Sequence, residues 1–76
     1  MIKKLSELTP GTSGKIHSIE DNELLLKLME MGCVPGETIR LDQLAPFGDP
    51  ISVTVAGYNL SLRLNEADAI FVETNR

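Results

Sequence analysis

The residue types that most often carry chemistry are rare in this chain. His17 is its one histidine and Cys33 its one cysteine, whereas zinc and iron sites usually draw several such ligands at short spacing. Ligand count therefore favours structural roles for both residues, and we predict no metal site. We expect Cys33 to be a small buried hydrophobe and His17 to lie on the surface of a strand.

Catalytic and cofactor-binding patterns are also missing. Nucleophilic catalysis needs a nucleophile, a base and an orienting group within hydrogen-bond reach, and a single histidine would have to serve here. The glycines are spread through turns, whereas a phosphate-binding loop gathers them before Lys-Ser/Thr at the start of a helix. We therefore predict that the chain is not an enzyme, has no catalytic residues and needs no cofactor.

The charge balance argues against nucleic acid as a partner. The net charge is −4 and the seven Lys and Arg are scattered, whereas neutralisation of phosphates supplies much of the affinity for nucleic acid. Proteins that bind single strands also stack bases on aromatic side chains. This chain has only three aromatic residues, namely Phe47, Tyr58 and Phe71.

Length and hydropathy set the expected organisation. With 76 residues, the chain is expected to form a single domain over residues 1–76. No apolar run approaches the roughly 18 residues of a membrane span, and no long apolar stretch follows the N-terminal lysines as it would in a signal peptide. One cysteine cannot form an internal disulfide, so we expect a cytoplasmic protein that is not embedded in a membrane.

One segment, residues 44–50, is a candidate binding loop. Two prolines there flank an aromatic residue and a glycine. In one interpretation the segment is a stiff connector whose Phe47 folds back onto the core, since Phe is usually buried. In the other it is an exposed, preordered loop that meets a partner, and preordering lowers the entropic cost of binding. The candidate partner-binding residues are Pro46, Phe47, Gly48, Asp49 and Pro50.

One amphipathic helix and several sharp turns should position this loop. Asp21 or Asn22 can cap the helix, and leucines and methionines at helical spacing follow over residues 24–31. Four residues are expected to form its end and the later turns by their backbone conformation: Gly32, Pro35, Gly36 and Gly57.

Alternating apolar residues predict strands over residues 14–19, 38–42, 51–55 and 60–64, and a last strand covers 70–73. Imperfect alternation in the first suggests a bulge or an early end of the strand. A two-residue turn at Gly57-Tyr58 would pair Val55 with Leu60 and continue that register along the hairpin. A helical turn capped by Asn65 should follow. The predicted fold is mainly β with one short helix, arranged as a small five-stranded, partly open barrel.

Several segments, taken together, resemble the FeoA family, the small cytosolic proteins of bacterial ferrous iron transport. They are residues 29–37, which contain the helix end and its turn, residues 45–51 and 57–63, and then Glu66-Ala67 and Ile70-Phe71-Val72. Their joint order is specific and covers nearly the whole chain. The sequence departs mildly from the family at Cys33, where a larger apolar residue is usual.

The resemblance implies an SH3-like barrel related to the C-terminal module of iron-dependent repressors. It also implies a non-enzymatic accessory protein whose partner is the cytosolic GTP-binding domain of the membrane iron transporter FeoB. Family descriptions attach transition-metal binding to this domain, so a metal-responsive sensor module is one alternative. A stand-alone barrel that binds Pro-rich peptides is another, although such sites need an aromatic-lined groove.

Overall fold

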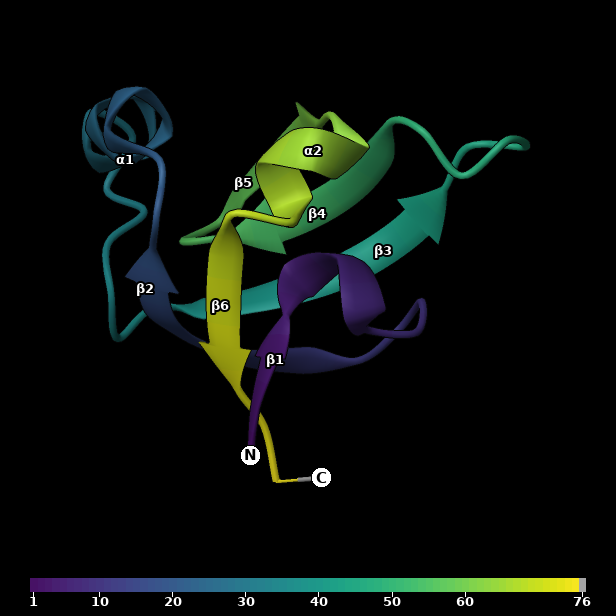
Figure 1. Ribbon diagram of the computed structural model, residues 1–76, viewed down its shortest axis with the longest axis horizontal. Helices are drawn as coiled ribbons and strands as arrows, with labels where there is room; N and C mark the ends of the chain where they lie inside the picture. The colour runs from purple at the N-terminus through teal and green to yellow at the C-terminus, as the bar shows by residue number, and fades with distance from the viewer. Residues whose placement is uncertain (76) are drawn as a thin grey trace.

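Short strands of alternating burial account for most of the fold. The computed structural model describes residues 1–75, and within them the strands form one antiparallel sheet in the order β1-β6-β2-β3-β4-β5 (Figure 1). The strands are β1 (Ile2–Lys4), β2 (Ser13–Ile19), β3 (Thr38–Leu44), β4 (Ile51–Val55), β5 (Tyr58–Leu62) and β6 (Ile70–Glu73). The helices are the 3-10 turn η1 (Leu5–Glu7), α1 (Asn22–Met29) and α2 (Leu64–Ala67).

The sheet bends around one apolar core. Register shifts between Ile16 and Ser18 in β2 and between Leu41 and Gln43 in β3 mark bulges, which bend strands and increase their twist. The expected bulge in β2 is thereby confirmed, as is the mainly β fold class. The side chains of the core are Leu5, Leu8, Ile16, Ile19, Leu24, Leu28, Cys33, Ile39, Leu41, Ile51, Val53, Val55, Leu62, Ala67, Ile70 and Val72.

The structure adds a strand that the sequence pattern did not predict. β1 pairs with β6, with Ile2 opposite Glu73, so the sheet has six strands within the described residues and not the expected five. β1 is only three residues long and shows no alternation of apolar and polar residues. It is therefore held by backbone pairing at a sheet edge, which leaves no periodic signal in the sequence.

Both ends of helix α1 have the capping residues that the sequence predicts. The Asp21 side chain accepts a hydrogen bond from the Leu24 N–H at 3.1 Å and caps the start. At the other end, the Gly32 N–H donates to the Met29 carbonyl (3.0 Å) and the Cys33 N–H to the Leu28 carbonyl (2.9 Å). These two bonds, with φ of +80° at Gly32, make a Schellman motif, which turns the chain toward β3. A second turn follows, with Pro35 second and Gly36 third at φ +99°.

The β4–β5 hairpin has a different register from the expected one. Its turn is Ala56-Gly57, with φ of +51° and +83°, which is the type I′ pattern, and not Gly57-Tyr58. Val55 therefore faces Tyr58, and Ile51 faces Leu62. The shift is two residues along β5, which keeps the same side chains on the inner face. The alternation of the strand therefore could not distinguish the two registers.

Helix α2 also starts earlier than expected. Leu64, expected to be the last inward residue of a strand, is the first residue of α2. Asn65, expected to be the cap, lies inside the helix, and Arg63 is the N-cap. The Arg63 N–H donates to Glu66 Oε1 at 2.9 Å, so the glutamate three residues on closes the helix start, as in half of a capping box.

Candidate functional site

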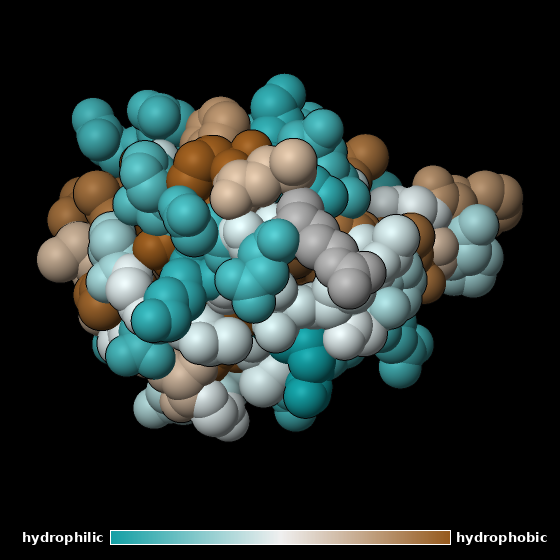
Figure 2. Space-filling model, turned by 90° about the horizontal axis from the view of Figure 1, so that it is seen from below, coloured by the Kyte–Doolittle hydropathy of each residue, from teal (hydrophilic) through white to brown (hydrophobic). Residues whose placement is uncertain are grey.

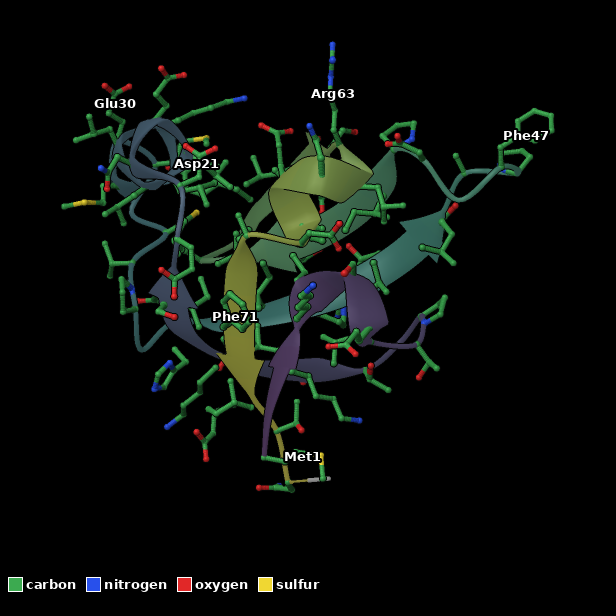
Figure 3. All side chains as sticks on the ribbon, viewed as in Figure 1. Met1, Asp21, Glu30, Phe47, Arg63 and Phe71 are labelled. Carbon is green, nitrogen blue, oxygen red and sulfur yellow. The ribbon has the colours of Figure 1, made fainter. Side chains whose placement is uncertain are left out.

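The loop of residues 45–50 between β3 and β4 projects from the molecule. It extends away from the sheet in Figure 1 and forms the narrow projection at the right of Figure 2. Phe47 lies at its tip, with 98% of its surface exposed, and Figure 3 shows its ring pointing into solvent. The interpretation in which Phe47 folds back onto the core is therefore wrong.

The backbone of this loop is held at its base. The Ala45 N–H donates to the Pro50 carbonyl at 3.1 Å, and the Gly48 N–H donates to the Ala45 carbonyl at 2.7 Å. Pro46 occupies the second position of this inner turn, where its fixed φ is favourable. A loop with both bonds is ordered before any partner arrives, so less conformational entropy is lost on binding.

Asp49 ties the loop to a distant part of the chain. Its Oδ1 accepts a hydrogen bond from the Leu64 N–H at 3.0 Å, so a loop carboxylate satisfies one of the free N–H groups at the start of α2. From the sequence, Asp49 was predicted only as part of the candidate partner-binding loop. This contact depends on tertiary structure, because 15 positions separate the two residues, and no local pattern predicts it.

A shallow cleft of about 240 Å³ lies beside the loop. Pro46 and Pro50 line one part of it, while Ser52 of β4 and Ser61 of β5 line another. The base of the loop that carries Phe47 therefore borders a surface of mixed apolar and polar character. Ser52 and Ser61 carry no signal for this site in the sequence, because their place beside the loop follows from strand pairing.

The outer face of β3 and β4 carries a polar network. Arg40 Nε donates to Asp42 Oδ1 at 2.6 Å, and the Thr54 hydroxyl lies 2.5 Å from Asp42 Oδ2 and 2.7 Å from the Asn59 side chain. The hydrogen bond from Thr54, followed by that from Arg40, lowers the pKa of the Asp42 carboxyl below its usual value. Asp42 is therefore a charged structural acceptor at neutral pH and is unsuited to proton transfer there.

The structure does not bring His17 and Cys33 together. His17 is exposed on β2, and its Nδ1 lies 3.4 Å from the Ser18 hydroxyl. Cys33 is fully buried and free, and burial, with a smaller effect from the charge of Glu37, raises the pKa of its thiol. Among residues 1–75, no group of three or more His, Cys, Asp or Glu side chains is placed to hold a metal ion.

In the part of the chain that the structure describes, no helix has the length and apolar character needed to cross a membrane. The longest helix there, α1, has eight residues.

A family model described as the FeoA domain matches residues 3–74 of the chain. A curated relative from Porphyromonas gingivalis, named "Fe(2+) transport protein A/Fe(2+) transporter FeoB fusion protein", is 41% identical over 71 residues. The match covers 92% of this chain and 8% of the relative. The chain therefore spans less than a tenth of the length of that fusion protein.

Solved structures show the same fold. The solution structure of the FeoA protein from Chlorobium tepidum has a TM-score of 0.90 at 36% identity, covering 97% of this chain and 71% of that one. The zinc complex of Stenotrophomonas maltophilia FeoA, described as an SH3 domain protein, has a TM-score of 0.79 at 34% identity, covering 91% and 87%. IdeR from T. acidophilum has a TM-score of 0.81 at 25% identity, covering 97% of this chain and 34% of that one.

Proposed function

This chain belongs to the FeoA family of ferrous iron transport, and we propose that it is a non-enzymatic accessory protein that binds the cytosolic GTP-binding domain of the transporter FeoB. The observation that carries the proposal is the Porphyromonas gingivalis relative, in which an A-type segment and FeoB form one polypeptide. Covalent linkage raises the effective concentration of two modules for each other into the millimolar range with a short flexible linker. Such fusion is useful when the two modules act on each other.

The loop of residues 45–50 is the proposed contact. An exposed aromatic side chain on a preordered loop is the type of residue that anchors protein interfaces, where a few aromatic and Arg side chains carry most of the binding energy. Phe47 is exposed at the tip, and the backbone bonds at Ala45 and Gly48 hold it there. The mechanism is docking: the chain changes the behaviour of the transporter by binding, without chemistry of its own.

Substitution of Phe47 tests this proposal. We expect Phe47→Ala to weaken binding to the purified cytosolic domain of FeoB from the same organism by about tenfold or more, which corresponds to about 1.4 kcal/mol. Isothermal titration calorimetry measures the affinity. Leu26→Ala is the matched control, because Leu26 is also an exposed apolar residue (63%) but lies on α1.

Three outcomes of this titration are distinct. Loss of affinity in Phe47→Ala alone supports the loop as the contact. Equal affinities of all three proteins would exclude Phe47 from the interface while keeping FeoB as the partner. Absence of binding by the unmodified protein at millimolar concentration would reject the cytosolic domain as the partner.

A metal-responsive role is the second candidate function, and its support is the zinc complex of the Stenotrophomonas maltophilia relative. In this chain the site would have to include exposed His17 and residues of a second copy. Anaerobic titration with Fe²⁺, or titration with Zn²⁺, tests it by NMR. Amide shifts that His17→Ala abolishes would support this role, and unchanged spectra would reject it.

A further inference from the structure

β5 is an open edge of the sheet. It is the last strand in the order and pairs only with β4 within residues 1–75. In a hairpin with a two-residue turn, the two residues that flank the turn form hydrogen bonds with each other. The next residue along each strand directs its backbone N–H and C=O groups away from the partner strand, and the two arrangements then alternate. Val55 and Tyr58 flank this turn. The backbone N–H and C=O groups of Asn59 and Ser61 therefore point away from β4, and both residues are exposed.

The two edges of the sheet differ in how they are protected against pairing with another chain. Proteins commonly block such edges with short strands, lysines, prolines or bulges. The other edge, β1, is three residues long and carries Lys3 and Lys4. β5 has five residues, Tyr-Asn-Leu-Ser-Leu, without charge or proline, and its register with β4 has no shift.

The open edge is continuous with the loop described above. Ser61, whose backbone faces outward, also lines the 240 Å³ cleft with Pro46 and Pro50. A strand paired along β5 would therefore run past the mouth of this cleft and reach the base of the projecting loop. The backbone donors and acceptors of the edge and the apolar loop thus border one surface.

We propose that an extended segment of the transporter's cytosolic domain pairs with β5 as an added strand, while the loop contacts the same partner. This inference rests on the proposed function. The edge determines the chemistry of its occupant, because two outward N–H and two outward C=O groups match a polypeptide backbone in extended conformation. A partner side chain can enter the cleft from such a strand, since alternate side chains point to opposite faces.

A second copy of this chain fits the edge less well. Five residues of β5 span roughly 17 Å, and pairing over that length alone buries far less than the roughly 1,000 Å² expected of a stable interface. Each copy also carries a net charge of −4, so like charges oppose self-association at low salt. A segment of a larger partner can add contacts at the loop and the cleft.

Amide hydrogen exchange of the full chain, read by NMR with and without the purified cytosolic domain of FeoB, tests the proposal. We expect the outward amides of Asn59 and Ser61 to exchange at least tenfold more slowly in the complex. The amide of Leu60, which already pairs with β4, serves as the internal control and should change much less. This alternation distinguishes strand pairing from simple coverage, which would slow neighbouring amides alike.

A variant gives an independent measurement. Ser61→Pro removes an N–H that points away from β4, so the hairpin ladder is kept, and its ring blocks an added strand. We expect Ser61→Pro to weaken binding about tenfold, since the hydrogen bond that this N–H would donate is lost and the ring hinders the added strand, and Leu26→Ala, on the exposed face of α1, to bind like the unmodified protein. Circular dichroism establishes that the variant is folded. If it is not, the exchange data alone decide.

The outcomes separate the two proposals. Binding with slowed exchange at Asn59 and Ser61 supports strand addition. Binding without slowed exchange at these two amides rejects strand addition but remains consistent with the proposed function. Absence of binding rejects the proposed function and this inference with it. If the same amides exchange slowly in the protein alone, and more slowly at higher protein concentration, the occupant is a second copy and the proposal is overturned.

Discussion

The thiol of Cys33 links stability to pH at the scale of a single residue. Burial, with a smaller effect of the Glu37 charge, raises the pKa of the thiol in the folded state. In the unfolded chain it ionises near the ordinary value of about 8.5. The unfolded state therefore loses its proton first, and stability falls as pH rises from about 8.5 toward the folded-state pKa.

We expect this dependence to disappear in Cys33→Ala. The variant loses packing in the core and is less stable than the unmodified protein at pH 7. At pH 9.5 the difference between the two should be smaller, because only the unmodified protein has a thiol to ionise. Urea unfolding at both pH values measures the two differences. A difference that stays constant would show that the folded protein does not retain the thiol proton.

Phe47 shows what a sequence can and cannot predict about one residue. The prolines and glycine around it predict a stiff loop, and the structure contains a hydrogen-bonded loop there. Whether the ring is buried depends on the direction in which the loop leaves the sheet, and that direction depends on β3 and β4. Local composition therefore predicts the order of the loop but leaves the exposure of its aromatic residue undecided.

At the scale of elements, the β4–β5 hairpin shows the limits of alternation. The strands of residues 51–55 and 70–73 agree with their predicted bounds, because alternation or a short apolar run marks them. The register of β5 does not agree, because a shift of two residues preserves the buried face. The choice between the two registers depends on the position of the turn. Ala56 adopts a positive φ there, a conformation that is usual for Gly, Asn and Asp and that the sequence therefore does not indicate at an alanine.

Two leucines of this region distinguish the two registers. Leu62 faces Ile51 and is 2% exposed, so we expect Leu62→Ala to lower the free energy of unfolding by roughly 2–5 kcal/mol. Leu64, which the other register would place in the core, begins α2 and is 38% exposed. Leu64→Ala should cost less than about 1 kcal/mol. Urea unfolding of both variants measures this, and equal large losses would contradict the register.

At the scale of the whole molecule, the first eight residues complete the core. β1 pairs with β6, Leu5 is fully buried, and the Ser6 hydroxyl donates to Asp68 Oδ1 at 2.5 Å, which links η1 to α2. The sequence pattern predicted no strand here. The place of β1 in the sheet depends on β6, near the other end of the chain, and such distant pairing leaves no local pattern.

Substitutions in this segment test its contribution. We expect Leu5→Ala to reduce the free energy of unfolding by roughly 2–5 kcal/mol, as for other buried leucines. Ile2→Ala is the control, because Ile2 lies on the edge strand and is 44% exposed, and it should cost less than about 1 kcal/mol. Thermal or urea unfolding by circular dichroism gives both values. A small loss for Leu5→Ala would mean that residues 1–8 dock weakly onto the remaining fold.

The anchoring of the loop base also makes the loop tip a place to insert foreign sequence. The backbone bond between Ala45 and Pro50 and the bond from Leu64 to Asp49 hold both ends of the loop to the sheet and α2, and neither involves the side chain of Phe47. The ends are therefore already joined, and each doubling of the loop length adds only about 0.6 kcal/mol of closure entropy. A short peptide epitope or a reporter group placed between Phe47 and Gly48 would be displayed on a scaffold of 76 residues.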